Sequence, residues 1–193
     1  MLALTTSLQD TLRTGFERAD RDGLPVLYRY LRPSDDIDAL TELLHAAYAP
    51  LAAAGMRFVA SYQDSETTRR RAAKGETIIA ATREGIIGTV TLATVQSTHG
   101  SPFYDRADVA SVGQFGVAPP HKGRGIGSSL MDLVEERARE LGVAYLALDT
   151  SEHAHGLMEL YGRRGYRFIE HVQWQDVNYR SVVMAKTLAA PQA

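Results

Sequence analysis

Apolar positions recur along the chain with two different periods, and these periods predict a mixture of strands and helices. Seven segments are rich in β-branched or aromatic residues, alternate in polarity, or are almost wholly apolar. They are predicted strands: 26–31, 77–82, 86–95, 109–117, 143–150, 166–174 and 178–186. Other segments repeat their apolar residues at helical spacing. They are predicted helices: 37–48, 65–74, 126–141 and 154–164.

Residues 109–150 are predicted to form a strand–helix–strand unit. The segment 143–150 (VAYLALDT) is almost entirely apolar, as in a strand that is buried on both faces beside a parallel neighbour. Such a pair is joined by a right-handed crossover, here through helix 126–141. Hairpin-like strands before and after this unit predict that the rest of the sheet is antiparallel.

The pattern is weak at both ends of the chain. A short helix is predicted within 6–19, but its apolar stripe of Leu8, Leu12 and Phe16 is thin, and Gly23 and Pro25 follow. We therefore expect an N-terminal extension at 1–24, one domain at 25–188 and a tail at 189–193. A length of 193 residues suits one domain of ordinary size.

Composition narrows the possible functions. Hydrophobic residues make up 45% and charged residues 23% of the chain, and the formal net charge of −2 gives no global attraction to nucleic acid or an anionic membrane. The absence of cysteine excludes disulfides, Cys-based zinc sites and a thiol nucleophile. With no long apolar run and a mixed-charge N-terminus, the sequence predicts a cytoplasmic protein.

A glycine-rich turn between a strand and a helix carries the clearest chemistry. The run KGRGIG at 122–127 alternates three glycines with Lys122, Arg124 and Ile126, and it leads into helix 126–141. A helix N-terminus presents unpaired backbone N–H groups and partial positive charge, and glycine lets a ligand approach the backbone. The turn therefore predicts a phosphate-binding site.

Two familiar nucleotide motifs fit this turn poorly. A Walker loop would need Gly-Lys-Ser/Thr at the helix start, and no lysine follows Gly127. A dinucleotide fingerprint would need glycine where Ser128 stands, although Asp149 lies at a spacing suited to a ribose contact. The hairpin-like strands on either side argue against that fold without excluding it.

Two motifs in order and at suitable spacing resemble the GNAT superfamily of N-acetyltransferases. The first is VAP at 117–119 followed by KGRGIG at 122–127, which is similar to that family's pyrophosphate-binding motif. The second is LYGRRGY at 160–166, which is similar to the family's later Leu/Phe-Tyr…Gly-Phe/Tyr motif. The element order matches over 25–188, and the likeness is sharp over 112–166.

The resemblance implies an α/β (α+β) fold and an activity. The expected fold is a mixed six- to seven-stranded sheet, flanked by helices, with a central parallel strand pair that splays apart. The expected reaction transfers an acetyl group from the cosubstrate acetyl-CoA to a primary amine of a small molecule or peptide, by direct attack in a ternary complex. No metal, nucleic acid or membrane is expected, and a homodimer is compatible with this interpretation.

The resemblance also assigns residues. The backbone of Phe115 and Val117 would pair with the pantetheine arm, and Tyr161 would protonate the departing thiolate. An amide near Phe115 would polarise the thioester carbonyl. The residues expected to hold the pyrophosphate are Lys122, Gly123, Arg124, Gly125, Ile126, Gly127 and Ser128.

The sequence departs from the family pattern at three places. Lys122 replaces the leading arginine or glutamine, residues 151–155 contain no asparagine for pantetheine, and Ser111 stands where some members have a glutamate base. The general base is therefore unassigned. The candidates are Asp108, His99, Glu152 and His155, or water alone.

Other interpretations remain open from the sequence. A non-catalytic acyl-CoA-binding sensor would keep the glycine turn but would not need Tyr161, and a nucleotide-binding α/β protein would lack acyl chemistry. The basic run 69–71 with Lys74 could meet the phosphate of a ligand, but such a run is more often the solvated face of a helix. A further set of aromatic residues is expected either in the core or along an acceptor pocket: Tyr48, Phe58, Tyr62, Phe103 and Tyr104.

Overall fold

One mixed sheet forms the centre of the protein in the computed structural model, which describes residues 7–94 and 100–188. The strand order is β1-β2-β3-β4-β5-β6-β8-β7, with β5 and β6 parallel and the other neighbours antiparallel. The strands are β1 (Phe16–Ala19), β2 (Pro25–Tyr30), β3 (Glu76–Thr82), β4 (Gly85–Ala93), β5 (Val109–Val117), β6 (Tyr145–Ser151), β7 (Arg167–Val172) and β8 (Ser181–Thr187).

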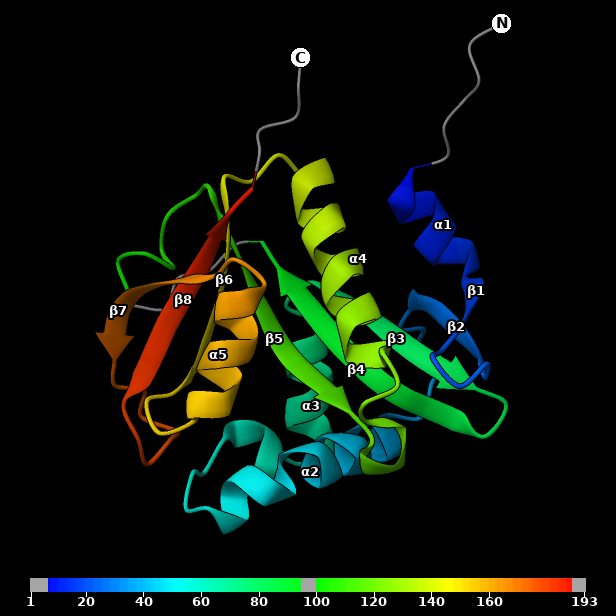
Figure 1. Ribbon diagram of the computed structural model, residues 1–193, viewed down its shortest axis with the longest axis horizontal. Coiled ribbons are helices and arrows are strands. Elements are labelled where there is room, and N and C mark those ends of the chain that lie inside the picture. The colour runs from blue at the N-terminus through cyan, green and yellow to red at the C-terminus, as the bar shows by residue number, and fades with distance from the viewer. Residues whose placement is uncertain (1–6, 95–99, 189–193) are drawn as a thin grey trace, which may run out of the picture.

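Helices cover both faces of this sheet. They are α1 (Leu8–Thr14), α2 (Ile37–Ala53), α3 (Ser65–Ala72), α4 (Ile126–Glu140) and α5 (His155–Arg163), with 3₁₀ turns η1 (Val59–Ser61) and η2 (Pro119–His121). Figure 1 shows α4 and α5 on one face and α3 on the other. A Cβ on Gly88 would meet Ile126 and Leu130 of α4, whereas one on Gly116 would meet α2. The helices α2 and α4 therefore pack on opposite faces.

The N-terminal segment differs from its predicted helix. Helix α1 ends at Thr14 because Gly15 turns the chain with a φ of 89°, and residues 16–19 then pair with β2 as an edge strand. This edge strand raises the sheet in the described residues to eight strands, rather than the predicted six to seven. Leu12 of α1 is fully buried against the main core.

The central parallel pair opens partway along its length. Residues Val109, Ala110 and Ser111 of β5 pair with Tyr145, Leu146 and Ala147 of β6, and the pairing then stops. Beyond this point β5 continues beside β4 and β6 continues beside β8. The predicted α/β fold with a splayed parallel pair is confirmed.

A bulge in β5 accompanies this opening. Gln114 has a φ of 46°, and the β4–β5 register shifts between Thr89 and Thr91 opposite it. A bulge bends its strand and redirects side chains, and bulges are common next to functional sites. The bent part of β5 leads directly to the glycine-rich turn.

The core supports this arrangement from the α4 side. Leu130, Val134 and Ala138 are spaced along one face of α4 and are fully buried with Leu146 and Leu148 of β6. Burying a leucine or valine side chain contributes about 1.5–3 kcal/mol. In the described ranges we find no helix that is both long enough and apolar enough to span a bilayer.

Candidate active site

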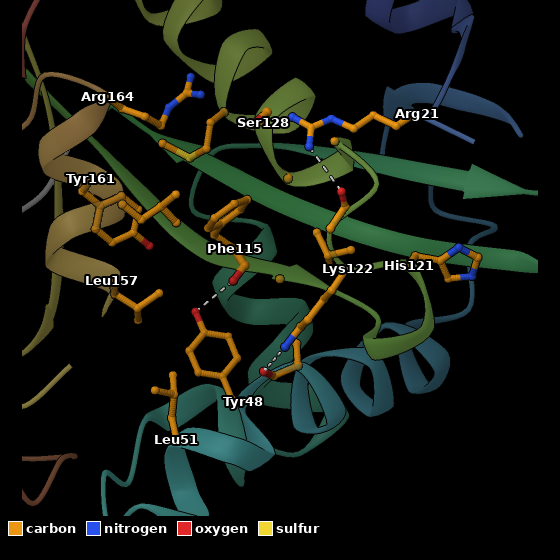
Figure 2. Close-up of a pocket in the computed structure, with 18 residues that line it drawn as sticks. Arg21, Tyr48, Leu51, Phe115, His121, Lys122, Ser128, Leu157, Tyr161 and Arg164 are labelled. Carbon is orange, nitrogen blue, oxygen red and sulfur yellow. Dashed lines mark hydrogen bonds between the residues drawn. The ribbon is translucent and has the colours of Figure 1, made fainter. Parts of the chain in front are cut away.

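A cavity of about 440 Å³ lies where β5 leaves β6, with α2 on one side and α4 and α5 on the other. Figure 2 shows its walls, which come from α2, β5, the glycine-rich turn, the start of α4, and α5. One further residue comes from the β1–β2 turn. The lining residues are Arg21, Ala47, Tyr48, Leu51, Phe115, Gly116, Val117, His121, Lys122, Gly123, Gly125, Gly127, Ser128, Met131, Leu157, Leu160, Tyr161 and Arg164.

The glycine-rich turn ends at an uncapped helix N-terminus. Gly125 is the N-cap of α4, its φ is 90°, and it offers no side chain to the first turn. The amides of Ile126, Gly127 and Ser128 have no acceptor within the described residues. Unsatisfied amides at a helix start form an anion site, so this geometry fits a pyrophosphate.

Close packing beneath the turn restricts Gly127. A Cβ placed there would lie 3.4 Å from Phe115 Cζ and 3.5 Å from Val117 Cγ2. The rings and methyl groups of β5 therefore fix the height of the α4 N-terminus above the strand. A larger residue at position 127 would push the unpaired amides away from the cavity floor.

The two cations predicted from the motif have different partners. Lys122 lines the cavity and donates its Nζ hydrogen bond to the Ala47 carbonyl of α2 at 3.0 Å. Arg124 points instead to the N-terminal segment, where its Nε lies 2.7 Å from Asp20 and 2.9 Å from Asp22. Among the predicted residues, the side chains of Arg124 and Ile126 are the two that do not line the cavity.

Arg21 brings a cation that sequence analysis did not identify. Its backbone N–H donates to the Arg124 carbonyl at 3.0 Å, and its Nη1 lies 3.4 Å from the Gly123 carbonyl. A Cβ on Gly125 would touch the Arg21 side chain at 3.4 Å. Figure 2 shows the guanidinium extended across the turn toward Ser128. No local sequence signal marks this residue.

Asp20 holds the β1–β2 turn in place. Its carboxylate accepts hydrogen bonds from the amides of Asp22 and Leu24, both at 2.9 Å, and faces Arg124. Burial opposes ionisation, but these hydrogen bonds and the charge of Arg124 keep the pKa of Asp20 below its ordinary value. The turn that carries Arg21 is thus fixed to the glycine-rich turn by charge and by hydrogen bonds.

Helix α5 forms the wall opposite the glycine-rich turn. Leu157, Leu160, Tyr161 and Arg164 are spaced at i, i+3, i+4 and i+7, so they share one face that borders the cavity. Burial raises the pKa of Tyr161 above its ordinary value, and the charges of Tyr48 and Asp149 add to the effect. The Tyr161 hydroxyl therefore keeps its proton at neutral pH.

Tyr48 closes the floor of the cavity from α2. Its hydroxyl donates to the Phe115 carbonyl at 3.0 Å, and its ring packs against Phe58 at 5.3 Å between centroids. Burial raises the pKa of Tyr48 to about 12. This residue belongs to the aromatic set that was predicted either in the core or at an acceptor pocket.

Three of the four residues considered as a general base do not line the cavity. Asp108 pairs with Arg106 at 2.6 Å and Glu152 pairs with Arg180 at 2.7 Å, and these arginines hold the pKa of both carboxyls below the ordinary value. Neither carboxylate, nor His155, lines the cavity. His99 lies outside the described residues. Within the described ranges, no group of three or more potential ligands could hold a metal ion.

Comparison with known proteins agrees with this geometry. The model of the acetyltransferase (GNAT) family matches residues 37–166. The S-(2-succino)cysteine N-acetyltransferase of Bacillus subtilis (strain 168) is 29% identical over 133 residues, which cover 68% of this chain and 78% of that protein.

Solved structures support the fold. The GNAT domain of S. lividans PAT superimposes with a TM-score of 0.67 at 22% identity, covering 90% of this chain and 97% of that one. The structure of yncA from Salmonella typhimurium, solved with acetyl-CoA, gives a TM-score of 0.63 at 16% identity and covers 87% and 98% of the two chains.

Proposed function

The chain belongs to the acetyltransferase (GNAT) family and is an acetyl-CoA-dependent acetyltransferase, and we propose that its acceptor is a primary amine of a small molecule or peptide. The transfer occurs by direct attack of the amine on the thioester within a ternary complex. The observation that carries this proposal is a single cavity between the unpaired amides of the α4 N-terminus and the buried Tyr161 hydroxyl.

The glycine-rich turn holds the pyrophosphate of acetyl-CoA in this proposal. The main-chain N–H groups from Lys122 to Ser128 surround the anion, so Arg124 and Ile126 contribute through their backbone even though their side chains point elsewhere. The charge of Arg21 faces the same anion from the β1–β2 turn. Lys122 is a point charge rather than a planar fork, and a main-chain cradle tolerates that difference.

The backbone of Phe115 and Val117, at the edge of β5 that opens away from β6, forms hydrogen bonds with the pantetheine arm in this proposal. Hydrogen bonds from this edge align the thioester with the gap between β5 and β6. The Tyr48 hydroxyl already donates a hydrogen bond to the Phe115 carbonyl, so in this proposal Phe115 meets the pantetheine arm through its N–H group. A backbone N–H near Phe115 polarises the thioester carbonyl as negative charge develops on oxygen.

Tyr161 assists the leaving group. As the amine nitrogen bonds to the acetyl carbon, the carbon–sulfur bond breaks and a thiolate forms, with an ordinary thiol pKa of about 8.5. The raised pKa of Tyr161 keeps its hydroxyl protonated and therefore available as a proton donor, and the same burial favours the neutral thiol over the thiolate. The proton passes from the tyrosine hydroxyl to sulfur, and the attacking nitrogen releases a proton to solvent as the neutral amide forms. Solvent then returns a proton to the phenolate, so no net proton is lost.

The curated relative suggests a first acceptor to assay. Its name describes N-acetylation of a cysteine thioether that carries an α-amine. At 29% identity this is a starting point for an acceptor screen rather than an assignment. S-(2-succino)cysteine and other S-substituted cysteines therefore lead the panel, with free CoA as the readout.

Replacing Tyr161 with phenylalanine tests the reaction. Tyr161→Phe should lower kcat about 100- to 10,000-fold, the usual contribution of one general acid, and leave acetyl-CoA affinity nearly unchanged. Tyr166→Phe is the matched control, because this buried tyrosine packs edge-on against Tyr161 at 6.0 Å but does not line the cavity. Unchanged turnover in Tyr161→Phe with saturating amine would remove this residue from the mechanism.

A further inference from the structure

Arg71 occupies a defined position next to the bulge in β5. It lies on α3, and its Nη1 donates to Gln63 Oε1 at 2.7 Å. Gln63 Nε2 in turn donates to Gln114 Oε1 at 2.9 Å and to Thr68 Oγ1 at 2.7 Å. Gln114 is the bulge residue immediately before Phe115, so this network fixes the guanidinium where β5 departs from β6.

In the part of the chain that the structure describes, Arg71 forms no salt bridge with a carboxylate. Six arginines in the described ranges are buried or half-buried, and the other five each form a salt bridge: Arg29, Arg124, Arg137, Arg139 and Arg164. Burial lowers the pKa of Arg71, against the opposing effect of Tyr48 and Asp149. A half-buried cation without a counter-charge is unfavourable unless a ligand supplies the anion.

Asp149 brings a carboxylate to the same face of the sheet. Leu146 and Leu148 pack with α4, so Ala147 and Asp149, which alternate with them along β6, face the opposite side of the sheet, where Tyr104 and Trp174 pack. Helix α3 lies on this same side of the sheet, behind β4 and β5 (Figure 1). Asp149 accepts hydrogen bonds from Trp174 Nε1 at 3.0 Å and from the Tyr104 hydroxyl at 3.3 Å. It forms no salt bridge with any cation of residues 7–94 and 100–188.

Arg71 is coupled to β5 and Asp149 lies on β6, each beyond the point where the two strands stop pairing, although neither side chain lines the cavity. The charge of Asp149 acts on Tyr48 and Tyr161, which line the cavity, and on Arg71. Gln114 couples Arg71 to the strand edge next to Phe115. The two faces of the sheet therefore suit different ligands. The glycine-rich turn on the α4 side suits the cofactor, and the charges of Arg71 and Asp149 on the α3 side suit the acceptor.

From this arrangement we propose that the acceptor is an α-amino acid or a derivative with a free α-carboxylate, bound with its carboxylate on Arg71 and its ammonium group beside Asp149. This inference rests on the proposed amine acetylation and names its substrate class. The planar guanidinium suits a carboxylate through paired hydrogen bonds. A phosphate dianion fits less well, because Asp149 repels the second negative charge.

Paired acceptors test the requirement for the carboxylate. Each α-amino acid of a panel, including S-substituted cysteines and aromatic amino acids, is assayed beside its own carboxamide with saturating acetyl-CoA. The wild-type protein should favour the acid over the amide about 10- to 100-fold in kcat/KM, the range expected when one charge-assisted hydrogen-bonded pair is lost. Equal use of acids and amides would overturn the inference.

Substitutions then test whether Arg71 is responsible for the preference for acids over amides. Arg71→Met should reduce the acid-to-amide ratio toward one, whereas Arg70→Met, on the exposed side of the same helix, should leave the ratio unchanged. Arg71→Lys keeps the charge without the fork and should give an intermediate ratio, which protects the test if the methionine variant folds poorly. Asp149→Asn should lower kcat/KM for the acids and the amides alike, because both kinds of acceptor carry the ammonium group.

The outcomes separate this inference from the proposed function. If Arg71→Met lowers activity on acids and amides equally, Arg71 has a structural role and the carboxylate assignment is wrong. If acetyl-CoA binds but neither acids nor amides are acetylated, amine acetylation itself is contradicted. Acetyl-CoA affinity of every variant, measured by calorimetry, reports whether the glycine-rich turn remains folded.

Discussion

Gly125 combines two constraints at a single residue. Its φ of 90° lies in the left-handed region, and a Cβ there would contact the Arg21 side chain. A non-glycine residue in this conformation costs about 1–2 kcal/mol. The residue is also the N-cap of α4, immediately before the amides that we assign to the pyrophosphate. A substitution of Gly125 therefore needs a control that separates the cost of backbone strain from the loss of ligand binding.

Replacing Gly125 with aspartate should remove measurable acetyl-CoA binding, because the new carboxylate would face the pyrophosphate. Gly142→Asp is the matched control, since Gly142 has a φ of 72° and follows the other end of α4 with open space around it. Both variants should lose similar thermal stability, and only Gly125→Asp should lose affinity in calorimetry. Normal binding by Gly125→Asp would contradict the assigned site.

The site residues that could be predicted from the sequence stand in short motifs, whereas those that were missed reach the site only through tertiary contacts. Gly123, Gly125 and Tyr161 stand within short motifs, so spacing alone brings them to attention. Arg21 and Arg71 reach the site through contacts with Gly123 and with the Gln63–Gln114 pair, and both depend on the tertiary fold. Arg71 also lies in a basic run whose pattern is typical of a solvated surface, and only burial distinguishes it from Arg70.

At the scale of elements, the β1–β2 turn and the glycine-rich turn act as one unit. The sequence predicted a helix through 6–19 because Leu8 and Leu12 are helically spaced, but Gly15 ends that helix and the following strand joins the sheet edge. The strand lies outside the 37–166 range that matches the family model. We propose that this N-terminal element adds a cation to the pyrophosphate site.

Arg21→Gln tests this contribution. It should raise the KM for acetyl-CoA about five- to tenfold with little change in kcat, a modest effect because the side chain is exposed and screened by solvent. Arg18→Gln is the control, since Arg18 belongs to β1 and stacks over Phe16, away from the cavity. A KM that is insensitive to Arg21→Gln, measured at low ionic strength, would exclude the arginine from cofactor binding.

The connection from β2 to α2 supplies a separate test of stability. Arg29 makes two hydrogen bonds of 2.7 Å to the Asp35 carboxylate, and the side chains are 11% and 12% exposed. Arg29 thereby lowers the pKa of Asp35 from its ordinary value of 3.8. A lowered native pKa contributes stability that is fully present above that ordinary value and is lost as the pH falls below it.

Asp35→Asn should therefore lower the free energy of unfolding by about 2–3 kcal/mol at pH 7, the scale of a charge-assisted pair. The deficit relative to the wild type should shrink as the pH falls through and below 3.8. Urea denaturation of both proteins between pH 3 and pH 7 measures this difference. A deficit that stays constant across the series would mean that ionisation of Asp35 does not contribute.

At the scale of the whole molecule, the cavity joins parts of the chain that are far apart in sequence. Its walls combine Arg21, Tyr48, Phe115, Ser128 and Tyr161, so no single segment forms it alone. The order of elements and the splayed strand pair were predictable because apolar periodicity and the two motifs are local properties. Which side chains meet across the gap was not predictable, since that depends on the bulge at Gln114 and on packing from both faces.

This shared construction predicts how the molecule responds to its cofactor. Acetyl-CoA should slow amide hydrogen exchange together in three segments, 20–24, 122–128 and 157–164, because each contributes to the same cavity wall. Strand β7, at the far edge of the sheet, should be unaffected and serves as the internal control. Free CoA should protect the same segments, whereas NAD should protect none. Protection confined to 122–128 would show that the N-terminal turn and α5 do not close around the ligand, and the proposed roles of Arg21 and Tyr161 would then lose their structural basis.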